Sequence, residues 1–201
     1  MRTMKRLILL APIGCLLTSL GAYDILYAEQ YYRMAHRHLY MSPERAAENI
    51  YYLEKALRAD FANPLNALAR IRNPQEWERY RYLFKMHVSL RIIENYLIMA
   101  NAFDKQVAYF YNSPWKRENL SSLEKAEAWY RAALFYWEEA LKWSEKAAST
   151  PPLHLEEIRF WIDQLHRITT GELNYFNIIQ RHLNRLEKVR ADFEAMDAST
   201  Y

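Results

Sequence analysis

The sequence predicts an all-α protein, an antiparallel array of about six to seven helices around one long central helix. Apolar residues recur at steps of three and four, and prolines divide the chain into helix-length segments. No long stretch shows the period of two that marks a strand. Beyond the apolar N-terminal stretch the chain holds only Gly171, too little glycine for phosphate-binding loops or tight hairpins. Dinucleotide-binding and P-loop functions are therefore excluded.

Residues 1–28 have the layout of an export signal. Three basic residues precede an apolar run from Leu7 to Ala22, and small residues mark cleavage points after Ala22 or Ala28. The run is short for a membrane span and Asp24 follows it closely, which favours a signal peptide over a retained N-terminal membrane anchor. Both alternatives place the rest of the chain in the periplasm or cell envelope, with membrane contact only through this segment.

Cys15, the one cysteine of the chain, raises lipidation as a third alternative. A bacterial lipobox fits poorly, because Pro12 stands at the third position back and the apolar run continues past the cysteine. Once Cys15 is removed, the chain can form no disulfide and carries no thiol nucleophile or cysteine metal site. Packing alone must then stabilise the fold.

Charge and aromatic content favour a protein that binds other proteins. The formal charge of +3 falls to +1 when the predicted leader, with three basic residues and Asp24, is removed. A nearly neutral surface argues against nucleic-acid binding. Aromatic residues make up 15% of the chain, and their large, partly polar side chains suit helix packing and partner contacts.

Two helices and a linking segment are predicted before the long helix. The first covers 23–39, where apolar residues recur on one side. Ser42-Pro43 predicts the start of the second, with Ser42 as N-cap and proline at the first helical position, and this helix runs to about Phe61. Asn63-Pro64 ends it, and 65–71 links to the next cap-and-proline pair.

The central element is the stretch 75–112, which contains neither Gly nor Pro. Asn73-Pro74 opens it and Pro114 closes it, so it is one very long helix or two fused end to end. Unbroken, it would span roughly 55 Å. Its apolar spacing predicts a helix buried along one side for its full length, on Leu83, Met86, Leu90, Ile93, Leu97, Ala100, Phe103, Val107 and Phe110.

Three further helices are predicted, separated by breaks at Ser149–Pro152 and at Gly171. Each carries apolar residues at helical spacing on one face. In chain order they run from Ser121 or Ser122 to about Ala148, from 155 to 168, and from 172 to about 195.

Two hexamers give the chain a weak internal repeat. Tyr52–Leu57 and Tyr136–Leu141 share Tyr, Glu, Ala and Leu in register, and both resemble the second helix of a tetratricopeptide repeat. They lie 84 residues apart, which is no multiple of the 34-residue period, and the Trp-Leu-Gly signature is missing. We expect one degenerate, repeat-like helical domain over 29–196 and a frayed tail over 197–201; the alternative is a chance match between amphipathic helices.

Residues 63–147 also carry a more specific resemblance, in six short segments: Asn63–Leu65, Tyr82–Met86, Glu94–Leu97, Phe103–Lys105, Tyr109–Asn112 and Tyr136–Ala140. These resemble a family of exported spirochaete helical proteins, which includes components of the collar around the periplasmic flagellar motor. The resemblance implies a non-enzymatic scaffold whose helices bind other collar or stator proteins. It implies no catalytic residues.

The six histidines do not form a metal-binding pattern. His36 and His38 are two residues apart and so point to different sides of a helix, whereas His166 and His182 lie on separate predicted helices. A zinc site needs three or four converging ligands. We expect no metal and no cofactor.

Paired carboxylates occur at Glu138-Glu139 and Glu156-Glu157. Adjacent residues on a helix face different directions, whereas glycoside hydrolysis needs two carboxylates on opposite sides of a cleft. A muramidase-like envelope enzyme is the alternative function on this ground, together with a small-ligand-binding helical protein.

Four aromatic residues around the Pro114 break are candidates for partner binding: Tyr109, Phe110, Tyr111 and Trp115. Trp and Tyr dominate the energetic centres of protein interfaces. The equal alternative is that they cover the core where two helices turn.

Three polar residues of the long stretch are further candidates. Arg91, Asn95 and Asn101 would line a groove that binds the backbone of a partner, or would simply form an outward polar face, which we favour. Taken together, the sequence predicts a non-enzymatic protein-interaction scaffold in the periplasm or cell envelope, with protein partners and no nucleic acid.

Overall fold

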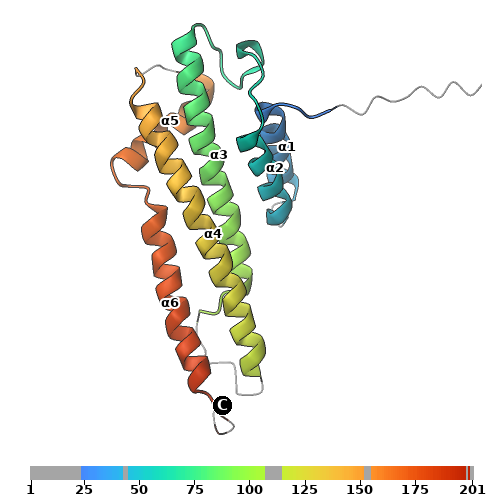
Figure 1. Cartoon of the computed structure of the whole chain (residues 1–201), viewed down its shortest axis with the longest axis vertical. Helices are drawn as coiled ribbons and strands as arrows, with labels where there is room; N and C mark the ends of the chain where they lie inside the picture. The colour runs from blue at the N-terminus through green and yellow to red at the C-terminus, as the bar shows by residue number, and fades with distance from the viewer. Residues whose placement is uncertain (1–23, 43–44, 107–114, 152–154, 198, 200–201) are drawn as a thin grey trace, which may run out of the picture.

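The computed structural model describes residues 24–42, 45–106, 115–151, 155–197 and 199. Within these residues the protein is all-helical and has no strand, as predicted (Figure 1). The elements are α1 Ala28–Met41, α2 Ala46–Arg58, η1 Pro64–Asn66, α3 Pro74–Phe103, α4 Lys116–Ala148, η3 Glu156–Ile158, α5 Arg159–Thr169 and α6 Tyr175–Ala195.

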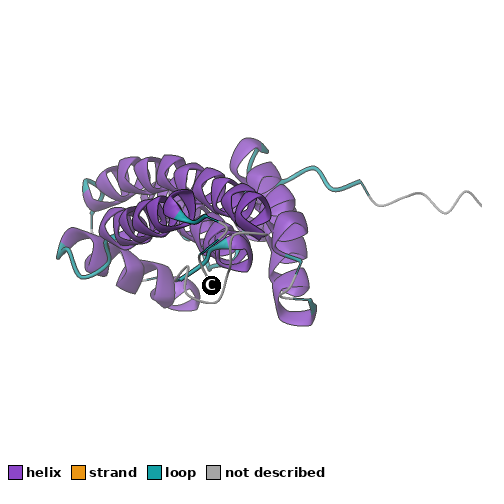
Figure 2. Cartoon of the chain, turned by 90° about the horizontal axis from the view of Figure 1, so that it is seen from below, coloured by secondary structure: helices purple, strands orange, loops and turns teal. Residues whose placement is uncertain are grey.

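A long antiparallel hairpin of α3 and α4 forms the centre of the molecule (Figure 1). The α1–α2 pair packs on one side of this hairpin through α2, and α6 packs along α4 on the other side, as the end-on view of Figure 2 also shows. The short helix α5 contacts both α3 and α4. The prediction of one long central helix is confirmed for α3, with 30 residues, and α4 is slightly longer, with 33.

The start of α3 follows its sequence signal. The Asn73 side chain accepts a hydrogen bond from the backbone N–H of Glu76 at 2.8 Å, and Pro74 occupies the first helical turn. The helix ends at Phe103, because Asp104 adopts an extended backbone. One unbroken helix over 75–112 is therefore wrong, and residues 107–112 lie outside the described part of the chain.

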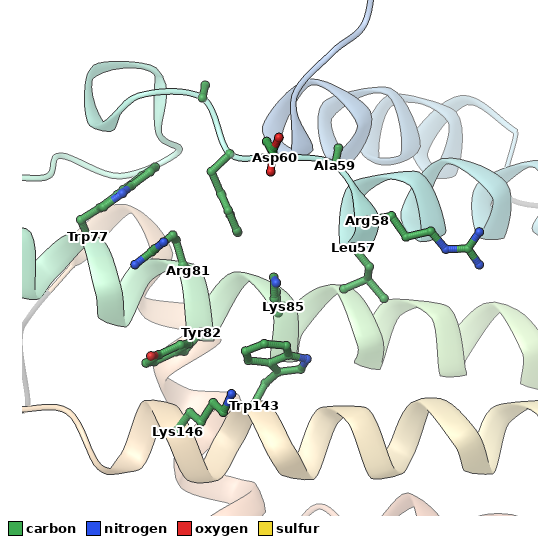
Figure 3. Close-up of a pocket in the computed structure, with 12 residues that line it drawn as sticks. Leu57, Arg58, Ala59, Asp60, Trp77, Arg81, Tyr82, Lys85, Trp143 and Lys146 are labelled. Atoms are coloured by element: carbon green, nitrogen blue, oxygen red, sulfur yellow. The ribbon is translucent and has the colours of Figure 1, made fainter.

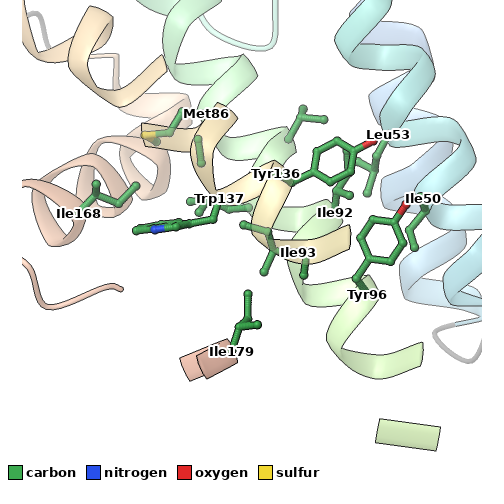
Figure 4. Packing of buried hydrophobic residues seen from close by; sticks show 14 of the residues in the cluster. Ile50, Leu53, Met86, Ile92, Ile93, Tyr96, Tyr136, Trp137, Ile168 and Ile179 are labelled. Carbon is green, nitrogen blue, oxygen red and sulfur yellow. The ribbon is translucent and has the colours of Figure 1, made fainter. Parts of the chain in front are cut away.

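The helix α3 is buried on almost every side between Tyr80 and Tyr96. Burial along one side only is wrong for this stretch, since α4 covers one side and α2 and α5 cover the others. Figure 4 shows Ile92, Ile93 and Tyr96 of α3 between side chains of α2 and α4. The fully buried apolar residues of α3 include the predicted Leu83, Met86, Leu90, Ile93 and Ala100, and also Tyr80, Phe84, Val88 and Ile92.

Other boundaries differ from the prediction by a few residues. The N-cap of α2 is Arg45 and not Ser42, and α2 ends at Arg58. The helix α4 begins at Lys116, ahead of the predicted Ser121 or Ser122. Gly171 does separate the last two helices, and its φ of 80° lies in the left-handed region that favours glycine.

The two repeat-like hexamers meet in space. The Tyr136 hydroxyl on α4 donates a hydrogen bond to Glu54 Oε1 on α2 at 2.5 Å, and Leu53 is fully buried beside them. The two helices that carry the hexamers are unequal, however, with 13 residues in α2 and 33 in α4, and α2 packs mainly on α1 and α3. The tetratricopeptide-like repeat stays a prediction.

Candidate functional site

An open groove of about 580 Å³ lies where the end of α2 and the loop 59–62 approach α3 and α4 (Figure 3). We call it the cationic groove, because basic and aromatic side chains dominate it. Its polar and aromatic lining consists of Arg58, Asp60, Phe61, Trp77, Arg81, Tyr82, Lys85, Trp143 and Lys146.

Two short segments with the same pattern supply most of this lining. These segments are Arg81–Lys85 on α3 and Lys142–Lys146 on α4. Each begins with a basic residue followed by an aromatic one, and each ends with a second basic residue four positions after the first. Residues four apart lie on the same face of a helix, so each segment presents two cations and an aromatic ring together. The α3–α4 hairpin then brings the two segments side by side (Figure 3).

Trp143 is the centre of the groove. Three ammonium groups surround its ring, with distances from Nζ to the ring centroid of 4.4 Å for Lys85, 4.6 Å for Lys146 and 5.3 Å for Lys142. Glu139 fixes the indole, because its Oε2 accepts a hydrogen bond from Trp143 Nε1 at 3.1 Å. The ring therefore holds the cations close together on one surface.

Trp77 and Arg81 form the second part of the groove. The Trp77 ring stacks on buried Tyr80, with centroids 5.3 Å apart, and the Arg81 guanidinium lies 5.9 Å from the Trp77 centroid. The buried Nε of Arg81 has no hydrogen-bond partner among the described residues. Arg81 thus carries a donor that nothing in the described chain satisfies.

Positive charge in the groove exceeds the negative charge around it. Asp60 is the one acidic residue of the lining, and within the described residues Arg81, Lys85 and Lys146 make no ion pair. Arg58 is different, because it pairs with Glu54 at 3.6 Å. The three cations give this surface an excess of positive charge, which attracts anions.

The ammonium group of Lys85 is partly withdrawn from water. Burial lowers its pKa from the ordinary value of lysine, and the neighbouring charges of Arg81, Lys146 and Lys142 lower it further, while Glu139 opposes them. The groove was not predicted from the sequence, although the repeated basic-aromatic spacing of Arg81–Lys85 and Lys142–Lys146 was a signal for it.

The predicted aromatic contact surface falls mostly outside the described residues. Tyr109, Phe110 and Tyr111 belong to that part of the chain, as does Cys15. Trp115 is described as the N-cap residue of α4 and is 61% exposed. It is not in the cationic groove, and its contact with a partner stays a prediction.

The three polar candidates on α3 do not share one surface. Asn95 is 1% exposed and its Nδ2 donates to the backbone oxygen of Arg91 at 2.8 Å, so both a partner-binding role and an outward polar face are wrong for Asn95. Arg91 is half-buried and pairs with Glu94. Asn101 is exposed and accepts a hydrogen bond from the Tyr130 hydroxyl at 3.0 Å. Partner binding by Arg91 and Asn101 stays a prediction.

His87 forms a buried polar contact that the sequence analysis did not single out. Its Nδ1 lies 2.6 Å from Gln164 Oε1 on α5, and its Nε2 lies 2.9 Å from the Tyr32 hydroxyl on α1. Because an amide oxygen only accepts, Nδ1 donates and Nε2 accepts from the Tyr32 hydroxyl. Burial lowers the pKa of His87 to about 3, so the ring is neutral in the folded protein at neutral pH.

The described segments hold no group of metal-binding residues and no helix that could span a membrane. Over 24–42, 45–106, 115–151 and 155–197, no three His, Cys, Asp or Glu residues are grouped so that they could hold a metal ion. None of the helices in this part of the chain has both the length and the apolar character to cross a bilayer.

Comparison with known proteins gives a family without a function. A family model described as a domain of unknown function (DUF8513) matches residues 75–196, more than half of the chain. The match spans α3 to α6, so it includes the α3 and α4 walls of the cationic groove but not the α2 wall. No curated protein and no solved structure matches the chain.

Proposed function

We propose that this chain, which belongs to the DUF8513 family, is a non-enzymatic protein-interaction scaffold of the periplasm or cell envelope. The cationic groove carries the proposal, because it is an exposed surface with aromatic anchors and unpaired charge on a long, well-packed hairpin. Interfaces concentrate their binding energy in aromatic and arginine side chains of this kind.

The envelope location rests on the export-signal layout of residues 1–28. The resemblance of residues 63–147 to components of the flagellar motor collar names one candidate assembly. We include it in the proposal as a prediction, with other collar or stator proteins as the expected partners.

The muramidase-like alternative gains no support from the groove. Glycoside hydrolysis needs two facing carboxylates, whereas the groove lining holds Asp60 alone among cations. The small-ligand alternative would use the same groove, because about 580 Å³ lies within the range of roughly 300–1,000 Å³ that ligand pockets occupy.

Isolation of the tagged protein from crosslinked cells, combined with cell fractionation, tests the proposal. We expect the protein in the envelope fraction, in a complex with one or a few defined envelope proteins. A monomeric protein in the cytoplasmic fraction would contradict it. Cleavage of purified peptidoglycan by the protein would instead support the enzyme alternative.

A further inference from the structure

We propose that the cationic groove binds an acidic, extended segment of a partner protein. Carboxylates of the segment would pair with Arg81, Lys85 and Lys146, while its apolar side chains would contact Trp77 and the remaining surface of Trp143. This inference rests on the proposed function, since it names the kind of partner that the scaffold recognises.

Unbalanced charge is the first argument for an acidic ligand. The lining holds four cations and one carboxylate, and Arg58 is already paired with Glu54. The other three cations lie around two tryptophan rings without a carboxylate partner in the described chain. Like charges held at such short range repel one another, and an incoming carboxylate relieves this repulsion.

Partial burial is the second argument. The Lys85 ammonium lies above the Trp143 ring, within reach of the Phe61 ring at 6.0 Å as well. A cation in such a place has lost part of its hydration, and a charged hydrogen-bond partner restores what water no longer supplies.

The ring surfaces argue against nucleobases and sugars. Proteins bind bases of single strands by stacking them on open aromatic faces, but the ammonium groups of Lys85 and Lys146 already lie near the Trp143 ring. A bilayer surface is also a poor fit, because the basic side chains line a hollow between α2, α3 and α4 and not a protruding face. A narrow polypeptide segment can enter such a hollow.

The size of the groove favours a polypeptide segment further. The volume of about 580 Å³ admits a short stretch of chain and not a folded domain. The inferred ligand is therefore a segment rich in Asp and Glu with interspersed apolar residues.

Binding of two labelled synthetic peptides to the purified full chain tests the inference directly. One peptide alternates Glu and Leu, and its control carries Gln at every Glu position. We expect fluorescence anisotropy to detect binding of the acidic peptide alone, and to show that the affinity falls as salt is added. Equal binding of the two peptides would overturn the inference.

A matched pair of charge reversals locates the site. Lys146→Glu lies in the groove, and Lys188→Glu makes the same change of charge on α6, outside it. Both side chains are exposed, so neither change disturbs the core. We expect Lys146→Glu to lower the affinity for the acidic peptide about tenfold or more, because the change removes a charge pair and adds a repulsion. We expect Lys188→Glu to leave the affinity unchanged. Equal effects would overturn the inference.

Lys85→Met adds a readout that a purely structural lysine would not give. The change removes a partly desolvated cation and keeps an unbranched side chain over the Trp143 ring, so we expect an unchanged or higher melting temperature together with weaker peptide binding. Weaker binding with a lower melting temperature would contradict the assigned role of Lys85.

Competition separates the ligand classes. We expect neither polyphosphate nor vesicles with anionic lipids to displace the acidic peptide at matched negative charge, and displacement by either at lower concentration would overturn the choice of a protein segment.

Failure of this inference can be told apart from failure of the proposed function. If the purified protein binds the acidic peptide in its groove but no partner is recovered from cells, only the scaffold function is refuted. If partners are recovered from cells equally well with Lys146→Glu, the groove is refuted as their binding site.

Discussion

The packing of neighbouring helices changes the pKa of individual side chains, and His87 is the clearest case. It is buried between Tyr32 and Gln164 and stacks on Trp161 with ring centroids 4.9 Å apart. These contacts join α1, α3 and α5 at one point. The neutral ring is therefore part of the folded state, and protonation must oppose folding.

We expect the stability of the protein to fall as pH falls through the window set by His87. The pKa is about 3 in the folded protein against an ordinary 6.5. Below about pH 6.5 the unfolded chain binds a proton that the folded chain does not bind, so the free energy of unfolding drops by at most about 1.4 kcal/mol per pH unit for this group. Above that range His87 has no such effect. Urea unfolding from neutral to mildly acidic pH measures the slope.

The variant His87→Gln provides the control. Glutamine keeps a polar side chain but does not titrate, so the slope between about pH 6.5 and pH 4 should become shallower. His182, whose pKa is lowered first by burial and then by Arg185, acts in the same direction but is more exposed. A slope in His87→Gln equal to that of the unchanged protein would show that His87 is not the titrating group.

Local signals in the sequence predict some residues well and others not at all. The roles of Asn73 and Gly171 depend only on the adjacent backbone. The position of Asn73 before Pro74 is enough to predict a helix start, and the position of Gly171 between two apolar-periodic stretches is enough to predict a break. Asn95 and Lys85 have roles that depend on which helix packs against them. Spacing along one helix cannot show that contact.

At the scale of whole elements, a polar cluster at the end of α3 holds α6 in place. Asp104, at the C-cap of α3, forms an ion pair with Arg185 of α6 and accepts a hydrogen bond from the Tyr130 hydroxyl of α4 at 2.8 Å. Its side chain is only 3% exposed. A second ion pair, between Glu127 of α4 and Arg190 of α6, is more open to solvent.

We expect Asp104→Asn to loosen α6 more than Glu127→Gln does. Loss of the buried charge leaves Arg185 without its carboxylate, which should cost about 1.5–3 kcal/mol, whereas a partly exposed pair contributes about 1 kcal/mol at most. Hydrogen exchange should therefore speed up over α6 and remain slow over Leu83–Tyr96 of α3. Equal exchange of α6 in the two variants would refute this ranking.

Element types were predictable from the sequence, whereas several helix boundaries and the groove were not. Apolar steps of three and four identify α3 to α6 because each helix buries a face. The start of α4 was missed because Lys116–Leu120 is mostly polar. The one buried residue of this segment, Asn119, is itself polar, so no apolar spacing marks the first turn of the helix. The groove arises only when the hairpin brings Arg81–Lys85 beside Lys142–Lys146.

At the scale of the whole molecule, the hairpin is a rod with the cationic groove on one side. With 30 residues in α3 and 33 in α4, it extends roughly 45–50 Å at ~1.5 Å per residue. The α1–α2 pair covers only part of one side, and the cationic groove lies where that cover ends (Figures 1 and 3). This shape suits a spacer that presents a docking site within an assembly.

The fold also distinguishes the two predicted cleavage points of the leader. Ala28 is fully buried at the start of α1, and its backbone N–H donates to the Asp60 oxygen at 2.9 Å, next to the groove. Cleavage after Ala28 would remove this contact, whereas cleavage after Ala22 leaves α1 intact. We expect mass spectrometry of the exported protein to find Tyr23 as its first residue. A mature chain that begins at Glu29 would contradict this.

A scaffold whose cationic groove receives an acidic segment of another protein must touch that segment in the cell. Site-specific photocrosslinking in living cells tests this most directly, with the reactive group at position 146 in the groove and, as control, at position 188 on α6. We expect a crosslink from position 146 to a peptide of an envelope protein that is rich in Asp and Glu, and none from position 188. Crosslinks from position 188 alone, or from position 146 only to lipid or to non-acidic peptides, would contradict it.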